Sequence, residues 1–324
     1  MRAVVVREPG PPEALEEAEF PRPSPLAGHV VVRVAAAGVN PVDATNRADP
    51  AWAGIEPPYV VGYELAGWVE ELGPGVAGFG HGDPIWAVLP VRGTRWGAYA
   101  EYVELEDRWL GLRPEALAAV DAAAIPLAGS TALQLLDRLA LQSGETVLVH
   151  GAGGGVGRLF VQLAHMRGIR VVAAASRTRH PLLRELGVEF VIDRETPDVV
   201  AAAVRQVGGL LDAVADCAGH GLLAPSLVGV REGGSAGSIV ELAGDFDEAI
   251  DRNLRLHGVL LRPERETLDS LRGAVEQGAL RPVVDAVVSP EEIVRTHRAL
   301  DTGSGPGRVV LRMADVDAGS GRAA

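Results

Sequence analysis

The chain has 324 residues, of which 47% are hydrophobic and 23% are charged, and its formal net charge is −13. This length exceeds what one hydrophobic core usually serves, so we expect two domains. The negative charge argues against a nucleic-acid partner and against an anionic membrane surface. No apolar run approaches membrane-spanning length, and the N-terminus lacks the apolar length of a signal peptide. We therefore expect a cytoplasmic protein.

Two residue types are scarce or missing. All 30 basic residues are arginine, and Cys217 is the single cysteine. The absence of lysine excludes Schiff-base chemistry, a P-loop lysine and the Tyr-x-x-x-Lys pair of short-chain dehydrogenases. A single cysteine excludes an intrachain disulfide and a cysteine-rich metal site.

The first 121 residues are predicted to be mainly β. Short apolar or alternating runs, separated by Gly and Pro, lie at Met1–Arg7, His29–Ala36, Val60–Leu72 and Asp83–Val88. Many short strands with turn signals are typical of a barrel-like β domain. The next stretch, Ala116–Leu139, has a helical pattern with a break at Pro126.

The segment from Thr146 to Asp193 predicts a βαβ unit. An apolar run, Thr146–His150, leads into the turn Gly151-Ala152-Gly153-Gly154-Gly155-Val156-Gly157, and a helical segment and the β-branched run Arg170–Ala175 follow. Glycines allow a sharp turn and the close approach of a pyrophosphate, which the amides and dipole of a helix N-terminus favour. The turn reads Ala152-x-Gly154-x-x-Gly157, with Ala in the first glycine position, and its context predicts a dinucleotide site.

The end of the second strand indicates which dinucleotide binds. An NAD site has Asp or Glu there to bind the ribose 2′-hydroxyl. This chain has Ser176, Arg177 and Arg179, and no carboxylate before Glu185. A hydroxyl and guanidinium groups would bind the 2′-phosphate that an acid would repel, so the sequence predicts NADPH.

Further strands are predicted at Phe190–Asp193, Ala213–Ala215, Ser238–Leu242 and His257–Leu261. Their alternation with helical segments is the pattern of a doubly wound parallel sheet. Two helical segments, Thr267–Gln277 and Pro290–Leu300, precede a last strand at Arg308–Met313, and the small, polar residues 314–324 are predicted to be a disordered tail.

Taken together, these segments resemble the zinc-independent quinone oxidoreductase branch of the medium-chain dehydrogenase/reductase family. The matching segments occur in family order along nearly the whole chain, and they are Ala37–Asp43 with Arg47, Val61–Gly67, Gly97–Tyr102, Gly144–Val147, the glycine turn, Glu185–Gly187, Asp212–Gly219 and Gly307–Leu311. The resemblance implies a GroES-like β domain at 1–121, completed by 263–313, and an NADP-binding Rossmann domain at 122–262, with the cofactor in the cleft between them. It also implies a homodimer formed through the edge strand of the Rossmann sheet.

Departures from the family bear on the chemistry. The catalytic zinc ligands of its alcohol dehydrogenases correspond to Asn40 and Tyr63, which are poor zinc ligands, and the four-cysteine lobe is missing. We therefore expect no metal, and a conjugated C=C or a quinone suits such a site better than a simple carbonyl. The family's usual lysines are replaced by Arg179 and Arg308, and its usual Tyr by Thr45, which weakens the case for a quinone.

Candidate residues follow from the resemblance and the turn. Asn40 is expected to hydrogen-bond the cofactor ribose or the substrate oxygen, with a turn role as the alternative. Tyr63 is expected to give a proton or hydrogen bond to the enolate, with core packing as the alternative. Asp43 and Arg47 are expected to pair and hold a loop. The expected cofactor contacts are Asn40, Thr131, Ala152, Gly154, Gly155, Val156, Ser176, Arg177, Arg179, Cys217, Ala243, Gly244 and Arg308.

The sequence thus predicts an NADPH-dependent reductase that transfers hydride to an α,β-unsaturated carbonyl or enoyl C=C, or to a quinone. The proton would come from Tyr63 or from solvent. The alternative is an NADPH-binding regulatory or structural protein with little catalysis, and zinc alcohol dehydrogenase is disfavoured.

Overall fold

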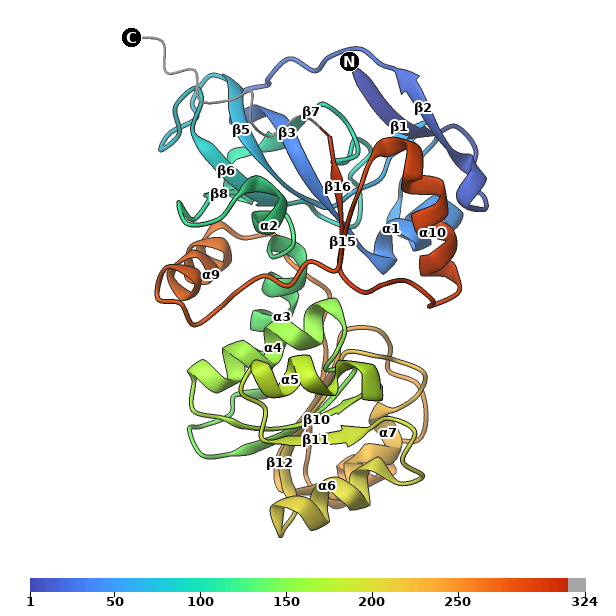
Figure 1. The fold of residues 1–324 in the computed structure, drawn as a ribbon, viewed down its shortest axis with the longest axis vertical. Coiled ribbons are helices and arrows are strands. Elements are labelled where there is room, and N and C mark those ends of the chain that lie inside the picture. Colours follow the sequence, from blue (N-terminus) through green and yellow to red (C-terminus); the bar gives the residue numbers. More distant parts are fainter. Residues whose placement is uncertain (314–324) are drawn as a thin grey trace. The chain divides into compact units, whose positions relative to one another are not determined.

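The computed structural model describes residues 1–313 and divides into two compact units (Figure 1). Of the described residues, unit 1 contains 1–127, 262–276 and 282–313, and unit 2 contains 128–261 and 277–281. The first boundary falls after residue 127 rather than the predicted 121, because the helix at Ala119–Ala122 packs on strands of unit 1 and the Leu127 amide donates to Glu64 at 2.8 Å. The predicted tail lies outside the described residues.

Unit 1 is built on two β-sheets. The smaller has the order β2-β1-β4, and the larger has the order β15-β16-β3-β5-β6-β8, with β7 pairing to β3. The strands are β1 (Arg2–Val6), β2 (Leu15–Glu19), β3 (His29–Val39), β4 (Tyr59–Val60), β5 (Glu64–Leu72), β6 (Pro84–Val88), β7 (Tyr102–Glu106), β8 (Leu110–Leu112), β15 (Ala286–Val288) and β16 (Val309–Arg312). The helices are α1 (Pro41–Ala48), α2 (Ala119–Ala122), α9 (Arg265–Glu276) and α10 (Ile293–Asp301).

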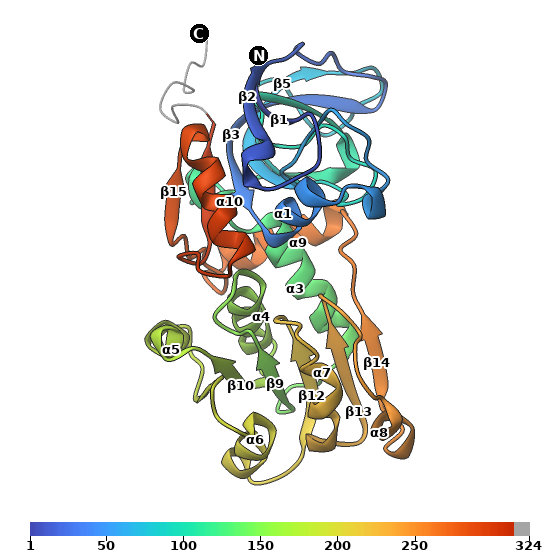
Figure 2. The same ribbon diagram turned by 90° about the vertical axis from the view of Figure 1, so that its right-hand side faces the viewer.

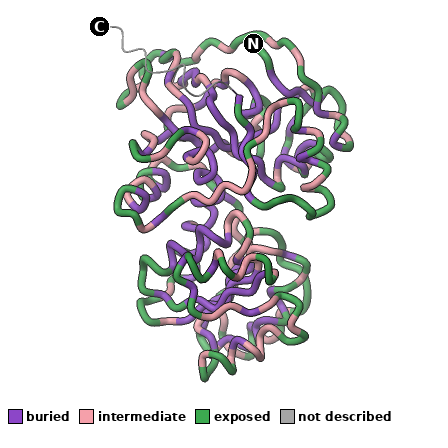
Figure 3. The backbone as a smooth tube through the Cα atoms, in the orientation of Figure 1, coloured by how far each residue is buried: buried purple, intermediate pink, exposed green. Residues whose placement is uncertain are grey.

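Strand β3 is the centre of unit 1. It pairs antiparallel with β5, β7 and β16, and its residues Val30–Val32 and Val34–Ala37 are fully buried (Figure 3). Because β16 joins this sheet, the C-terminal part of the chain completes the β domain. The sequence did not predict α1, which begins directly after β3 and continues the segment that carries Asn40.

Unit 2 is a six-stranded parallel sheet in the order β11-β10-β9-β12-β13-β14 (Figure 2). The strands are β9 (Thr146–His150), β10 (Arg170–Ala175), β11 (Phe190–Asp193), β12 (Leu211–Asp216), β13 (Val230–Ser238) and β14 (Arg255–Gly258). The helices are α4 (Gly155–Met166), α5 (His180–Glu185), α6 (Val199–Val207), α7 (Leu223–Ser226) and α8 (Asp247–Asp251), and α3 (Pro126–Leu139) crosses from unit 1 into unit 2. This strand order is that of a doubly wound dinucleotide-binding sheet, which confirms the predicted fold class.

The predicted strand at Ser238–Leu242 is wrong. The strand is β13, which ends at Ser238 and pairs with β12 and β14. Its glycines have low β-propensity, so tertiary pairing rather than local sequence determines it. The predicted edge strand also begins earlier than expected and ends at Gly258.

Residues 119–139 form one stretch that is long and apolar enough for a membrane span by length and composition, contrary to the prediction that none exists. The structure divides this stretch into α2 and α3, and 83% of its most apolar window is buried in the fold. It is therefore best explained as core helix.

Candidate functional site

The glycine turn of unit 2 joins β9 to α4 and leaves the start of the helix accessible. Gly154 is the N-cap residue and is exposed, and Gly155 and Val156 are partly exposed. The first backbone N–H groups of a helix have no acceptor within it, so this end of α4 offers donors to an anion. A Cβ on Gly157 would lie 2.3 Å from the Gly151 carbonyl oxygen and 2.7 Å from Ala152 Cα. Only glycine therefore allows this tight turn.

The other predicted contacts of unit 2 lie in loops that follow the parallel strands, except Thr131. Cys217 follows β12, and its amide donates to the His150 carbonyl at 3.0 Å, which places it beside the glycine turn. Burial raises the pKa of the Cys217 thiol, so the sulfur is protonated at neutral pH. Ala243 and Gly244 lie in an exposed loop after β13, and Thr131 is buried on α3. Ligands of open α/β sheets bind at this carboxyl edge.

The turn after β10 carries the residues predicted to read a 2′-phosphate. Ser176 Oγ and Thr178 Oγ1 lie 3.1 Å apart, and Arg177 is exposed. The Arg179 side chain lies against Gly153 of the glycine turn, since a Cβ on Gly153 would be 2.8 Å from Arg179 Cγ. Arg177 Nε donates to the carboxylate of Asp193 at the end of β11. The structure thus brings Ser176, Arg177 and Arg179 to one end of the sheet, beside the glycine turn.

These features fit a dinucleotide. The tight turn that Gly157 allows, the accessible amides of α4 and the cationic turn after β10 are the three parts that a pyrophosphate and an adjoining ribose phosphate require. Unit 2 alone supplies all of them.

Unit 1 holds a buried ion pair at the predicted catalytic asparagine. Arg308 Nη2 donates to Glu64 Oε1, and both side chains are at most 4% exposed. Asn40 bridges the two, because its Nδ2 donates to Glu64 Oε1 at 2.7 Å and its Oδ1 accepts from Arg308 Nη1 at 2.7 Å. A Cβ on Gly38 would lie 2.3 Å from Glu64 Oε1 and 2.5 Å from Arg308 Nη2, so glycine makes room for the pair.

Arg308 directs all five of its N–H groups to acceptors within unit 1. Besides Glu64 and Asn40, they are the carbonyl oxygens of Ala123, Ala124 and Val39, at 3.3, 3.1 and 3.1 Å. These bonds give Arg308 a structural role, and a cofactor phosphate would have to displace one of them. The predicted cofactor contact of Arg308 stays a prediction. Asn40 is likewise engaged at both ends of its amide, and its predicted contact with cofactor or substrate stays a prediction.

Tyr63 is fully buried and accepts a hydrogen bond from Asn46 Nδ2 at 2.6 Å. Burial raises the pKa of the Tyr63 hydroxyl well above its usual value. A phenol in this state is a poor acid, so the geometry favours the alternative of core packing. The proton-donor role of Tyr63 stays a prediction.

A second buried network connects α1 with α10. Asp43 and Arg47 do not pair with each other as predicted; Arg47 donates to Asp301 Oδ2 at 2.8 Å, and Arg47 Nη1 lies 3.1 Å from His297 Nδ1. Because arginine only donates, Nδ1 of His297 accepts and its proton lies on Nε2. That nitrogen lies 3.4 Å from the Tyr99 hydroxyl, which donates to Asp43 Oδ2 at 3.1 Å. The Asp43 carboxylate also accepts from the backbone N–H of Asn40 at 2.6 Å, so the network holds the start of α1.

Burial perturbs two titrating groups of this network in opposite directions. Burial, with a smaller contribution from the Glu64 charge, raises the pKa of Asp43 to about 7. The hydrogen bonds from Asn40 and Tyr99 and the Arg308 charge act in the opposite direction and lower this pKa. Burial and the Arg47 charge lower the pKa of His297 to about 4. The folded state therefore binds more protons than the unfolded state at Asp43 between about pH 4 and 7, and fewer at His297 between about pH 4 and 6.5.

We expect Asp43→Asn to remove a pH-dependent loss of stability. The raised pKa of Asp43 contributes stability below about pH 4 that is lost as the pH rises through about 7, so the variant should gain on the wild type by about 2–4 kcal/mol between pH 4.5 and 8. Both proteins keep His297, whose contribution cancels in the difference between them.

Urea unfolding followed by tryptophan fluorescence measures this difference in the free energy of unfolding, because all five tryptophans lie in unit 1. Asp269→Asn, at an exposed position on α9, is the control; a difference that is flat with pH would contradict the assignment.

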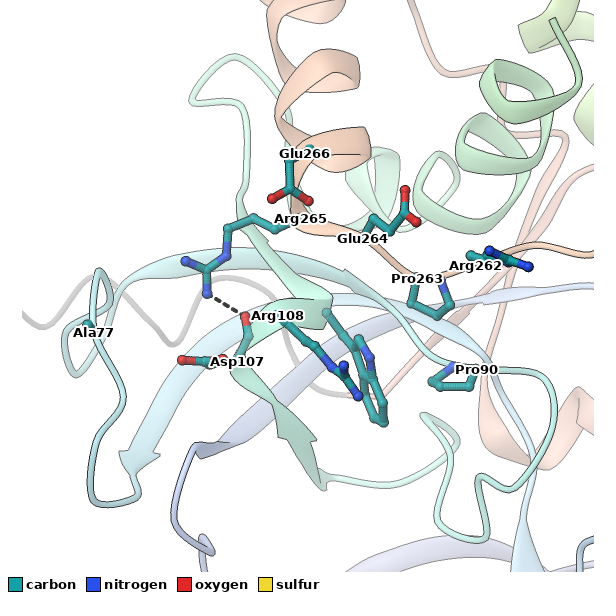
Figure 4. A pocket seen from close by; sticks show the side chains of 10 residues that line it. Ala77, Pro90, Asp107, Arg108, Arg262, Pro263, Glu264, Arg265 and Glu266 are labelled. Carbon is teal, nitrogen blue, oxygen red and sulfur yellow. Dashed lines mark hydrogen bonds between the residues drawn. The ribbon is translucent and has the colours of Figure 1, made fainter. Parts of the chain in front are cut away.

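Unit 1 also contains an open pocket of about 710 Å³ (Figure 4). Its lining combines an apolar wall with charges of both signs: Ala77, Pro90, Asp107, Arg108, Trp109, Arg262, Pro263, Glu264, Arg265 and Glu266. Arg265 donates to the Asp107 carbonyl at 2.6 Å and lies 4.7 Å from the Phe79 ring centre. Asn40 and Tyr63 do not line it, and the sequence did not predict Trp109 as a pocket residue.

Comparison with known proteins assigns the family. Residues 26–115 match the alcohol dehydrogenase GroES-like domain and residues 186–311 match the zinc-binding dehydrogenase domain. The chain is 33% identical over 291 residues to 2-methylene-furan-3-one reductase of Solanum lycopersicum, covering 87% of this chain and 71% of that protein. A quinone oxidoreductase from Coxiella burnetii superposes with a TM-score of 0.88 at 30% identity, covering 97% of this chain and 99% of that one. A structure described as an NAD-dependent alcohol dehydrogenase gives 0.89 at 32% identity, with 97% and 100% covered.

The chain belongs to the quinone oxidoreductase-like branch of the medium-chain dehydrogenase/reductase family. The resemblance and the fold predicted from the sequence are thereby confirmed, and an oxidoreductase with a nicotinamide-dinucleotide-binding fold is supported. Although the second domain description mentions zinc, no group of three or more His, Cys, Asp or Glu side chains within residues 1–313 is placed to hold a metal ion.

Three residues that hold these sites in place were not predicted from the sequence. Asp216, buried at the end of β12, accepts from the amides of Ala218 and Gly219, both at 2.9 Å, and so orders the loop of Cys217. Glu64 and His297 carry the two networks of unit 1. A polar residue directly after an apolar run was the signal available for Asp216, whereas nothing local marked the partners of Glu64 or His297.

Proposed function

We propose that the chain is an NADPH-dependent reductase that delivers hydride to a conjugated acceptor, either an enone or enoyl C=C or a quinone, without a metal ion. The observation that carries this is the pairing of an accessible glycine turn with a Ser176–Arg179 turn rich in hydroxyl and guanidinium groups. The turn at 151–157 and the amides of α4 would hold the pyrophosphate, and Arg177 and Arg179 the 2′-phosphate.

When bound, the reduced nicotinamide supplies a hydride. The protein's own groups contribute position and charge rather than acid catalysis, because the hydroxyl of Tyr63 is buried with a raised pKa. Solvent is therefore the proposed source of the proton. A conjugated acceptor is favoured because the chain presents Asn40 and Tyr63 where related alcohol dehydrogenases carry zinc ligands, and a conjugated carbon is electrophilic without a Lewis acid. The furanone reductase relative is named for such an enone.

The first test is NADPH and NADH oxidation against a quinone, a linear enone, a cyclic enone, an enoyl thioester and an aldehyde. Turnover with a conjugated acceptor supports the proposal and identifies its class. Tight NADPH binding with no turnover on the whole panel would instead favour a binding protein, the alternative that Thr45 in place of the family tyrosine supports. Stoichiometric zinc by elemental analysis would overturn the metal-free reaction.

A homodimer through edge strand β14 and a cytoplasmic location stay predictions. Light scattering would test the homodimer.

The cofactor preference has its own prediction. Arg177→Ala with Arg179→Ala should weaken NADPH by about 30-fold and NADH by less than about 3-fold, because charge-assisted bonds to the 2′-phosphate exist only with NADPH. Fluorescence titration of both dinucleotides measures the two dissociation constants. Arg184→Ala, an exposed arginine on α5, is the matched control. Equal losses for NADPH and NADH would mean that these arginines do not read the phosphate.

A further inference from the structure

A carboxylate reaches the predicted phosphate turn from the neighbouring strand. Asp193, the last residue of β11, pairs in register with Ala175, the last residue of β10, so its side chain lies beside the Ser176–Arg179 turn. Arg177 Nε donates to Asp193 Oδ2, and the Glu195 amide donates to Oδ1 at 3.1 Å. No acid follows β10 in the sequence before Glu185, so local sequence did not reveal this carboxylate.

The two partners differ in how firmly they are held. The Asp193 side chain is 14% exposed and is fixed by the strand and by the Glu195 amide, whereas the Arg177 side chain is 85% exposed. The Arg177 guanidinium lowers the pKa of Asp193, so the carboxylate is charged at neutral pH. The arrangement is therefore a mostly buried negative charge paired with an exposed positive charge.

A 2′-phosphate in this turn would meet both groups. Arg177 would have to divide its donors between Asp193 and the phosphate, and the carboxylate would repel the phosphate charge. A ribose 2′-hydroxyl carries no charge and would meet neither penalty. Arg179 lies elsewhere in the turn, with its stem against Gly153 of the glycine turn.

We infer that Asp193 sets how strongly this site prefers NADPH over NADH, by holding Arg177 in an ion pair and by adding a negative charge beside the 2′-phosphate position. This inference rests on the proposed use of NADPH. It makes the preference for NADPH smaller than the guanidinium groups of the turn alone would give.

The test is the affinity of the full chain for NADPH, NADH, 2′,5′-ADP and 5′-AMP in wild type, Asp193→Asn, Arg177→Ala and the double variant. Asp193→Asn should tighten NADPH and 2′,5′-ADP by about 3- to 10-fold and change NADH and 5′-AMP by less than about 2-fold. In the Arg177→Ala background the gain should be smaller, because Arg177 is no longer there to be released and only the removal of the negative charge remains. Glu189→Gln removes one charge just before the start of β11, about 13 Å away, and should change nothing.

Each other result overturns the inference. Equal tightening of NADPH and NADH would show a general charge effect, and unchanged or weaker NADPH binding would show that Asp193 does not oppose the phosphate. Weaker NADH binding in Asp193→Asn would make the carboxylate a ribose acceptor instead. If the wild type binds NADPH and Asp193→Asn binds it equally well, this inference alone is refuted. If the wild type binds neither dinucleotide, the proposed function is refuted as well.

Discussion

Replacing Gly157 by valine is expected to weaken NADPH and NADH binding alike by about 100-fold. A Cβ at this position would meet the backbone of the glycine turn, at 2.3 Å from the Gly151 oxygen and 2.7 Å from Ala152 Cα. Backbone atoms cannot turn aside as a flexible side chain can, so the turn must open and the amides of α4 must leave the pyrophosphate. Losing one or two charge-assisted hydrogen bonds accounts for a change of this size. Titration of each dinucleotide by fluorescence measures it.

The Gly157→Val result separates two parts of the cofactor site. Because the pyrophosphate is common to both dinucleotides, their affinities should fall together, whereas the arginine variants should affect NADPH alone. Gly209→Ala is the control, since a Cβ there meets nothing within 4 Å. Undiminished binding in Gly157→Val would show that the turn does not hold the pyrophosphate, and a loss confined to one dinucleotide would show that the turn reads the adenosine end.

The strands that the sequence predicts to the residue are those with the simplest physical environment. β9, β10 and β11 lie where predicted, because parallel strands covered on both faces are continuous apolar runs bounded by polar or glycine residues. β13 has the opposite character, since its glycines and serines do not favour a strand and its neighbours β12 and β14 hold it. Local sequence determines the first kind of strand and tertiary pairing the second.

The same distinction explains the sites. The glycine turn and the Ser176–Arg179 turn are local in sequence, so spacing alone locates them. Asp193 approaches Arg177 only through strand pairing, and no window of sequence contains that contact. Arg308 and Glu64 are 244 positions apart, and the role that the family suggested for Arg308 did not reveal that its donors are used inside unit 1. A charged residue in a family motif can thus have its donors engaged within the fold.

That interpretation predicts a large loss of stability in Arg308→Met. The substitution leaves the fully buried Glu64 carboxylate with only the Asn40 amide and the Leu127 N–H as donors among residues 1–313. Removing one partner of a buried ion pair usually costs about 3–5 kcal/mol, because the remaining charge stays desolvated and unpaired. Urea unfolding followed by tryptophan fluorescence should report this loss directly, since every tryptophan lies in unit 1.

The double variant Glu64→Gln with Arg308→Met should be more stable than Arg308→Met alone, because no buried charge then remains unpaired. The matched control is Arg7→Met, which removes an ion pair with Glu16 whose side chains are 57% and 55% exposed and should cost less than about 1 kcal/mol. If Arg308 instead bound the 2′-phosphate, the double variant would bind NADPH poorly and NADH normally. We expect the ratio of the two affinities to stay at the wild-type value, because the donors of the guanidinium are already used within unit 1.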